Sequence, residues 1–253
     1  MSVFTERQLP FELELAMSGQ PWRDWVRVPA AIATRGTAWY DMNGSGWDST
    51  IPAWGVSETL KISSDNAADT NVAVIVYGYD QNNEFQIQTG GTDRFNGQTK
   101  SIILGSWSRV LHVEFNPANV SNHVGQIFVY KDTAIVAGVP TDKTAIRANL
   151  VPGYGASARG LISVIPGRKA TLRSVEITQN GLNAGEVRIM KREYGDTVWS
   201  RIGPVFSPFG TDELYVEPYI EIESGWDVKL QGRRQPGATG DVLIYGACEV
   251  VWK

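Results

Sequence analysis

The chain has 253 residues, a hydrophobic fraction of 42%, a charged fraction of 20% and a formal net charge of −4. Such a length can bury one large or two ordinary cores, and no apolar run approaches the roughly 20 residues of a membrane-spanning helix. The 23 basic and 27 acidic residues are well mixed, so no basic stripe indicates nucleic acid as a partner.

The composition predicts an all-β protein. The chain holds 26 Gly, 12 Pro and 9 Trp but only 2 His. These counts are typical of many short strands that are joined by tight turns, with large rings between the sheets. We therefore expect a β-sandwich or jelly-roll-like fold with two β subdomains behind a loop-rich N-terminal arm.

The N-terminal region, residues 1–55, has little sustained periodicity yet holds five of the nine tryptophans. Aromatic side chains are enriched at protein interfaces, so we expect an extended arm that docks on another subunit. We also expect residues 56–253 to fold without this arm. Stacking of the same rings on sugars is the alternative. The candidate interface residues are Trp22, Trp25, Trp39, Trp47 and Trp54.

Two segments in the first half predict strands of different burial. Both alternating sets of residues between Val72 and Tyr79 are apolar, which predicts a strand buried on both faces at the centre of a sandwich. The polar residues 80–83 that follow tolerate a tight turn. Residues Trp107–Phe115 alternate instead and predict a half-buried strand, with Arg109 as the exception on its apolar face.

Further strand candidates follow along the chain, separated by Gly, Asn, Asp and Pro clusters. A Gly- and Pro-rich stretch around residues 132–157, in which residues 142–149 are weakly helical, indicates a boundary. We therefore assign residues 56–135 to a first β-sandwich, 136–160 to a linker and 161–253 to a second. The other candidates are Leu60–Ser63, Glu84–Thr89, Thr99–Leu104, Gly125–Tyr130, Leu161–Ile165, Ala170–Thr178, Glu186–Arg192, Leu214–Ile222, Trp226–Gln231 and Val242–Trp252.

Catalytic and metal-binding patterns are mostly missing. The spacing of His112, His123 and Cys248 matches no zinc site, so we expect no metal and no cofactor. The oxygen ligands of Asp65 and Asp69 lack the EF-hand pattern, and we expect them to cap backbone amides. Carboxylate pairs could support a glycosidase, but we expect solvated faces. These pairs are Glu12 with Glu14, Asp212 with Glu213, and Glu221 with Glu223.

Two blocks of sequence resemble a group of tailed-bacteriophage virion proteins. The first is Ser63–Thr70 followed by Val74–Asp80, where a Ser/Asp/Thr-rich entry leads to a strand that ends in Gly-x-Asp. The second is Val164–Leu172, with a Pro-Gly turn, followed by the strand Glu186–Arg192. The resemblance covers residues 60–253 as an order of elements and leaves the first 55 residues outside it.

This resemblance implies a non-enzymatic structural component of a phage particle, attached to the head or the tail. It implies an oligomer, for which we expect a trimer, with other virion structural proteins as partners and neither nucleic acid nor membrane bound. The protein would be made in the host cytoplasm, since its start lacks an export signal and Cys248 has no second cysteine to pair with. A carbohydrate-recognition module of a tail fibre or another glycan-binding protein is the alternative, and a glycosidase ranks third.

Overall fold

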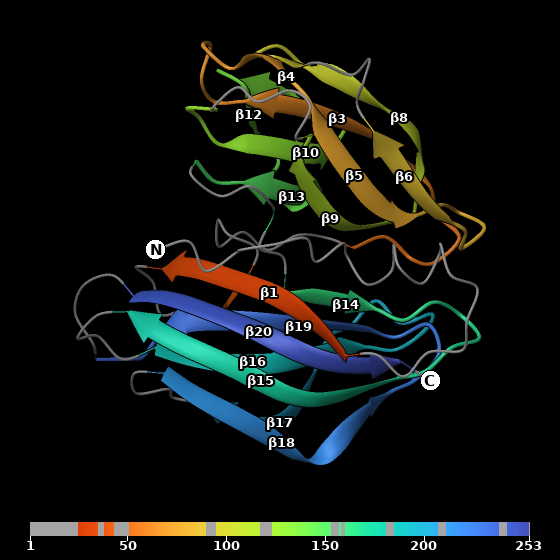
Figure 1. The fold of residues 1–253 in the computed structure, drawn as a ribbon, viewed down its shortest axis with the longest axis vertical. Coiled ribbons are helices and arrows are strands. Elements are labelled where there is room, and N and C mark those ends of the chain that lie inside the picture. The colour runs from red at the N-terminus through yellow and green to blue at the C-terminus, as the bar shows by residue number, and fades with distance from the viewer. Residues whose placement is uncertain are drawn as a thin grey trace.

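The computed structural model describes residues 25–34, 38–42, 51–89, 95–116, 123–152, 157, 160–180, 185–206, 211–237 and 242–252. These residues form β-strands and one short 3-10 turn, η1 (Lys143–Ala145), which confirms the predicted all-β fold. In the parts of the chain that are described, no helix could span a membrane. Figure 1 shows two β bodies stacked one above the other.

The lower body in Figure 1 is a sandwich of two sheets. Successive strands of this body alternate between the two sheets except at β2–β14 and at the β16–β17 hairpin, where both strands lie in the same sheet. The body thus has the strand order of a jelly roll, the name used for it below. One sheet has the order β1 (Trp25–Thr34), β20 (Val242–Trp252), β15 (Ala170–Asn180), β18 (Thr211–Ile222). The other has the order β14 (Leu161–Ser163), β19 (Asp227–Arg234), β16 (Gly185–Arg192), β17 (Ser200–Phe206), and β2 (Tyr40–Asp41) also pairs with β19.

The upper body is inserted between β2 and β14. These two strands share β19 as neighbour, with Asp41 opposite Gln231 and Ser163 opposite Asp227. The chain leaves the jelly roll at Met42 and returns at Gly160, and Gly160 N donates to Met42 O at 2.8 Å. The segment between them forms a complete second sandwich, which we call the inserted sandwich.

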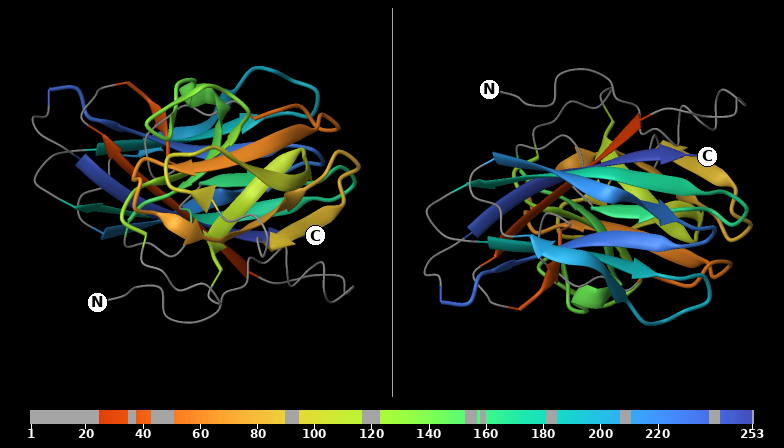
Figure 2. Two further views of the ribbon diagram at one scale, coloured as in Figure 1. Left: turned by 90° about the horizontal axis from the view of Figure 1, so that it is seen from above. Right: turned by 90° about the horizontal axis from the view of Figure 1, so that it is seen from below.

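The inserted sandwich has a four-stranded and a three-stranded sheet, with two strand pairs beside them. Viewed from above in Figure 2, it lies in front of the jelly roll, and viewed from below it lies behind. The larger sheet has the order β13 (Ile146–Leu150), β10 (Ile127–Lys131), β3 (Glu58–Ser64), β8 (Ser101–Trp107). The smaller has the order β6 (Phe85–Thr89), β5 (Val74–Tyr79), β9 (Arg109–Phe115); the pairs are β4 (Thr70–Val72) with β7 (Phe95–Asn96), and β11 (Ile135–Val136) with β12 (Val139–Pro140).

The apolar segment from Val72 to Tyr79 is divided between two strands and not one as predicted, because Val72 ends β4 and β5 begins at Val74. Strand β5 is the middle strand of its sheet, and Val74 and Val76 face the core between the two sheets. Tyr77 and Tyr79 are buried on the opposite face, at 3% and 6% exposure. Ile75, on the same face as the tyrosines, is only partly buried. Burial on both faces is therefore confirmed for β5 except at Ile75.

The segment Trp107–Phe115 differs from its predicted single strand. Trp107 ends β8 in one sheet, and Arg109 begins β9 in the other, so the chain crosses between sheets at Ser108. Ser108 N donates to Tyr79 O at 2.8 Å, which holds the crossing against β5. Trp107 is 1% exposed and belongs to the core, as expected for a tryptophan on a strand.

The structure departs from the predicted segments at two places. Within the expected loop-rich arm, β1 pairs with β20 along ten residues of the jelly roll, and β2 pairs with β19. Within the expected linker, β13 is an outer strand of the larger sheet of the inserted sandwich, directly after η1. In both cases the strands form because they pair with strands that are distant in the sequence, and the local pattern of small, polar and Pro residues does not predict them.

Candidate functional site

The buried polar centre of the molecule is Asp227, at the point where the two bodies meet. Its carboxylate accepts hydrogen bonds from Nε and Nη2 of Arg109, both at 3.1 Å. It also accepts from Nε and Nη2 of Arg192, at 3.2 and 2.5 Å, and from Ser163 Oγ at 2.6 Å. Arg109 belongs to the inserted sandwich and the other three residues to the jelly roll, so this ionic seam joins the two bodies.

Strand ends place each group of the seam. Arg109 is the first residue of β9, Arg192 the last of β16 and Asp227 the first of β19. All three are buried, with exposures of 2%, 7% and 1%. A charge in such a place is tolerated only with paired charges and satisfied hydrogen bonds, and the shared carboxylate supplies both.

The same arginines also hold the segment that leads into the inserted sandwich. Arg192 Nη1 donates to Ile51 O at 2.5 Å, and its Nη2 donates to Pro52 O at 3.1 Å. Two residues later, Trp54 Nε1 donates to Gly225 O at 2.8 Å, and the guanidinium of Arg109 lies 4.1 Å from the centre of the Trp54 ring. The segment that enters the inserted sandwich is thus bound to the jelly roll by hydrogen bonds of its backbone carbonyl groups and of the Trp54 ring.

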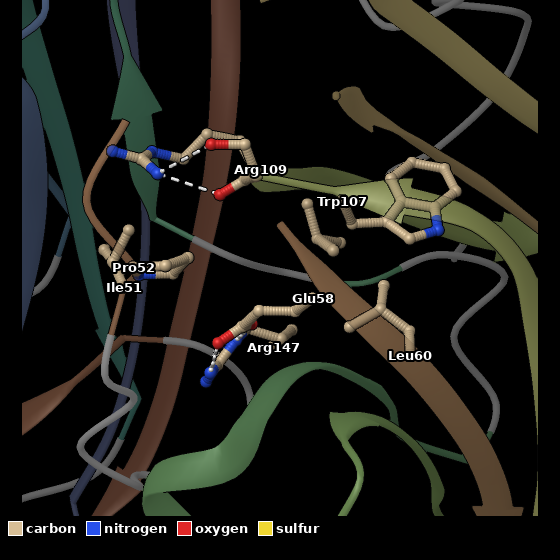
Figure 3. A pocket seen from close by; sticks show the side chains of 9 residues that line it. Ile51, Pro52, Glu58, Leu60, Trp107, Arg109 and Arg147 are labelled. Carbon is tan, nitrogen blue, oxygen red and sulfur yellow. Dashed lines mark hydrogen bonds and ion pairs between the residues drawn. The ribbon is translucent and has the colours of Figure 1, made fainter. Parts of the chain in front are cut away.

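A second buried ion pair lies beside the seam. Arg147 binds Glu58 with two hydrogen bonds, at 2.7 and 2.8 Å, and both residues are nearly buried. Figure 3 shows this pair and Arg109 around a small cavity that Ile51 and Pro52 also line. The cavity measures about 10 Å³, which is the room that one water molecule needs and too little for an organic substrate.

The electrostatics of the seam favour a fixed structure over proton transfer. Burial lowers the pKa of the Arg109 guanidinium, and attraction to Asp227 opposes this change. Arginine nevertheless stays protonated at neutral pH, so it cannot act as a base. Because Asp227 accepts five hydrogen bonds from three side chains, the carboxylate is also occupied.

The tryptophans predicted as an interface have different surroundings. Trp54 and Trp39 are both half-buried, and the guanidinium groups of Arg188 and Arg233 each lie 4.4 Å from the centre of the Trp39 ring. Both rings therefore contact cations of their own chain. Trp25 lies on β1, without a described side chain, and Trp22 and Trp47 lie outside the described residues.

The carboxylates that were weighed as ligands or catalysts have structural contacts where they are described. Asp69 accepts from Val124 N and Gly125 N, at 2.7 and 3.0 Å, which confirms its predicted role as a backbone cap. Asp65 does the same for Gln126 N at 2.8 Å. Glu223 pairs with Lys169 at 2.7 Å on the surface. In the described ranges, no group of three or more His, Cys, Asp and Glu could hold a metal ion.

The other carboxylate candidates are less defined. Glu221 is exposed on β18, as expected for a solvated face. Asp212 and Glu213 lie on the same strand without described side chains, and Glu12 and Glu14 lie outside the described residues. The structure thus brings none of the described candidate acids together as a pair across a cleft.

Sequence reasoning missed the ionic seam, although one signal pointed to it. Arg109 interrupts the apolar face of its segment, and an interrupted face indicates either a surface position or a buried charge with a partner. The partner is 118 residues away in the chain, and no local pattern connects the two.

No protein-family model matches the chain, and no curated protein matches it. Among solved structures, the VP2 subviral particle of infectious bursal disease virus has a TM-score of 0.28 and 7% identity, covering 96% of this chain and 77% of that one. The structure of the Gx strain of the same virus has a TM-score of 0.20 and 8% identity, covering 97% and 82%. T=1 particles of its D431N VP2 mutant give a TM-score of 0.22 and 8% identity, covering 98% and 80%. Similarities of this size do not define a function.

Proposed function

We propose that the protein is a non-enzymatic structural component of a bacteriophage virion, which acts through protein–protein interfaces as a head or tail accessory or adaptor protein. The ionic seam is the observation that carries this proposal. Arg109, Asp227 and Arg192 fasten an inserted sandwich to a jelly roll through buried, hydrogen-bonded charges. Breaking such a pair is costly, so the two bodies move as one unit.

A rigid two-body unit suits a particle component, because its interfaces must keep their relative positions during assembly. The seam also provides stability without a disulfide, which the single Cys248 cannot form within the chain. The buried charged groups bind one another and leave a cavity for about one water molecule. The seam is therefore better suited to hold the two bodies together than to catalyse a reaction. The sequence resemblance to virion proteins supports the phage assignment.

The test is to locate the chain in purified virus particles. Particles are separated on a density gradient and probed with an antibody against the chain, and immunogold electron microscopy then gives its position on the head or tail. We expect the chain at a fixed copy number per particle. Its absence from particles would contradict the proposal, and tryptophan fluorescence that changes with an oligosaccharide would favour the carbohydrate-binding alternative.

A further inference from the structure

A lysine and an aspartate meet away from solvent on the face of the jelly roll that also carries Asp227. Lys229 Nζ lies 2.7 Å from Asp41 Oδ1, and the two side chains are only 6% and 7% exposed. On β19, Lys229 stands between two residues that are each 1% exposed, Val228 and Leu230, so its side chain points to the other face of the sheet. Lysine is almost never buried without a partner, and here the partner comes from β2. We call these two residues the Lys–Asp pair.

Apolar side chains enclose the lysine. Leu161 on β14 and Met190 on β16 are directly opposite Lys229 in the sheet, and they are 5% and 7% exposed. Residues that are opposite each other in a sheet share one face, so these two side chains flank the lysine. The centre of the Trp199 ring lies 4.4 Å from Nζ. The amino group is thus shielded from bulk water.

The carboxyl group of Asp41 has a second fixed contact. Gln231 Nε2 donates to Asp41 Oδ1, the oxygen that also contacts Lys229, at 2.9 Å. Arg188 sets the orientation of this amide, because its Nε and Nη2 donate to Gln231 Oε1 at 2.9 and 2.7 Å. A donor held against a carboxyl oxygen stabilises the negative charge that develops there when a nucleophile attacks the carbon. Gln231 is therefore placed to activate Asp41 towards attack by Lys229.

We propose that Lys229 and Asp41 form an isopeptide bond, an amide that links β19 to β2 covalently. Proton transfer from Nζ to the carboxylate first gives a neutral amine and a neutral carboxylic acid. The lone pair of Nζ then attacks Cγ, which lies within about 4 Å because it is bonded to Oδ1. The bond from Cγ to one carboxyl oxygen breaks, and this oxygen leaves as water with two of the three Nζ protons.

The reaction needs no further reactant. The ammonium and carboxylate groups together contain the same atoms as the amide and one water molecule, and no atom is oxidised or reduced. Pairing of β2 with β19 holds the two groups together, which replaces a bimolecular encounter. A lysine that is desolvated among apolar side chains is also a typical activated nucleophile.

Burial favours the amide over the ion pair. Two charges that are taken out of water lose their hydration, and a neutral group of similar volume is often at least as stable. The amide is neutral and avoids this loss. Exclusion of bulk water also opposes hydrolysis, which would reverse the condensation.

The bond fastens the point where the inserted sandwich joins the jelly roll. Asp41 directly precedes Met42, and Lys229 directly precedes Leu230, whose N and O bind Gly160 and Met42 at 2.9 Å. Unlike a disulfide, an amide needs no oxidising compartment. This inference goes beyond the proposed function, and only the value of the bond to a particle rests on that function.

The test is the intact mass of the full natural chain after incubation of the purified protein at neutral pH. We expect a mass that is lower than that of the sequence by one water molecule, and tandem mass spectrometry of a digest should locate the link at Asp41 and Lys229. Lys229→Met and Asp41→Ala should each have the full mass of their sequence. Lys169→Met is the matched control and should still lack one water, because Lys169 and Glu223 are also 2.7 Å apart but are 55% and 38% exposed.

The variant Gln231→Met tests the chemical role of the amide. The mass of freshly synthesised chain is followed over time, and loss of water should be about a hundredfold slower in this variant than in the natural chain. Circular dichroism verifies that the variant folds. A Gln231→Met chain that loses water as fast as the natural chain would refute the role of Gln231.

Two results would overturn the isopeptide bond itself: a natural chain that keeps the full mass of its sequence, or a loss of water that persists in Lys229→Met. The first needs no variant, so it decides the matter even if every variant fails to fold. The mass is measured without particles. A natural chain of full mass would therefore leave the proposed function standing, and absence of the chain from particles would leave the bond standing.

Discussion

Gly160 N donates a hydrogen bond to Met42 O at 2.8 Å, so the residues at which the chain leaves and re-enters the jelly roll are direct neighbours. Leu230 on β19 binds both of them, accepting from Met42 N and donating to Gly160 O, each at 2.9 Å. The jelly roll is thus closed at this point without help from the inserted sandwich. Adjacent ends of this kind are what tolerated domain insertions require.

We therefore expect the jelly roll to fold when residues 43–159 are replaced by a short Gly/Ser linker. The shortened chain should give a β-type circular dichroism spectrum and a cooperative thermal transition. Its melting temperature should be lower than that of the full chain, because Asp227 keeps Arg192 but loses Arg109. An unfolded product would show that the jelly roll needs the seam in order to fold.

The ionic seam should behave as one energetic unit. Asp227→Asn removes the buried charge that both arginines share and should cost about 3–5 kcal/mol in the free energy of unfolding. Arg109→Met should cost less, because Asp227 keeps its hydrogen bonds from Arg192 and Ser163. In the double variant the two costs should not add, with a coupling energy of about 1–3 kcal/mol. Urea unfolding of the natural chain and the three variants gives these values.

A control for the seam is the surface pair of Lys100 and Asp132, at 2.7 Å and with a 54% exposed carboxylate. Lys100→Met should change the free energy of unfolding by less than about 1 kcal/mol, because water screens an exposed pair. Equal losses at the two pairs would contradict the assignment of Arg109 and Asp227 as the joint between the bodies.

The sequence predicts the positions of many strands but few of the pairings between strands that are distant in the chain. Strand β5, the larger part of the predicted strand Val72–Tyr79, could be placed because two apolar faces indicate a strand that is covered on both sides. Pro166 and Gly167 could be placed because Gly167, at φ +92°, supplies the turn geometry that Pro–Gly favours. By contrast, β1 carries Pro29 and several alanines, and its partner β20 lies at the other end of the chain. The insertion and the seam depend on such distant pairings.

Gly78 should not tolerate a side chain. It lies on β5 where the register with β9 shifts, and a Cβ there would lie 1.9 Å from Arg109 O. Gly78→Ala must push β9 away and disturb the strand that carries Arg109, at a cost of about 3 kcal/mol or more. Thr59→Ala, at an exposed position of β3, is the control and should cost less than about 0.5 kcal/mol. Thermal unfolding of both variants is the measurement, and equal melting temperatures would refute the close contact.

Glu114 should make stability depend on acid pH. Burial alone would raise the pKa of this carboxyl, but hydrogen bonds from His112 and Tyr77 bring it below its ordinary value of 4.5. A pKa that is lower in the folded state gives stability that is present above the unfolded pKa and is lost as the pH falls through the folded pKa. The melting temperature should therefore decrease as the pH is lowered from about 4.5.

The variant Glu114→Gln removes this titration, so its melting temperature should depend less on pH over the acid range. Glu84→Gln, at an exposed position, is the control and should keep the slope of the natural chain. If the melting temperature of Glu114→Gln depends on pH as that of the natural chain does, other carboxyl groups cause the loss of stability in acid.

The pairing of β1 with β20 predicts that residues 56–253 do not fold on their own. Sequence patterns favour a chain of residues 56–253 that folds without its N-terminal region, but this chain lacks the strand that covers β20 along ten residues. Without β1, one sheet of the jelly roll loses its outer strand and β20 becomes an exposed edge. We expect residues 56–253 to aggregate or to lose the cooperative transition of the jelly roll.

Adding the missing strand as a separate peptide tests this cause directly. A peptide of residues 23–36 should restore a cooperative transition to the chain of residues 56–253, because the ten-residue register with β20 can re-form between two molecules. A peptide with the same composition in scrambled order should not, since it cannot place alternate side chains on the correct face. If the truncated chain folds cooperatively without any peptide, β1 is dispensable, and residues 1–55 act as the arm that the sequence predicts.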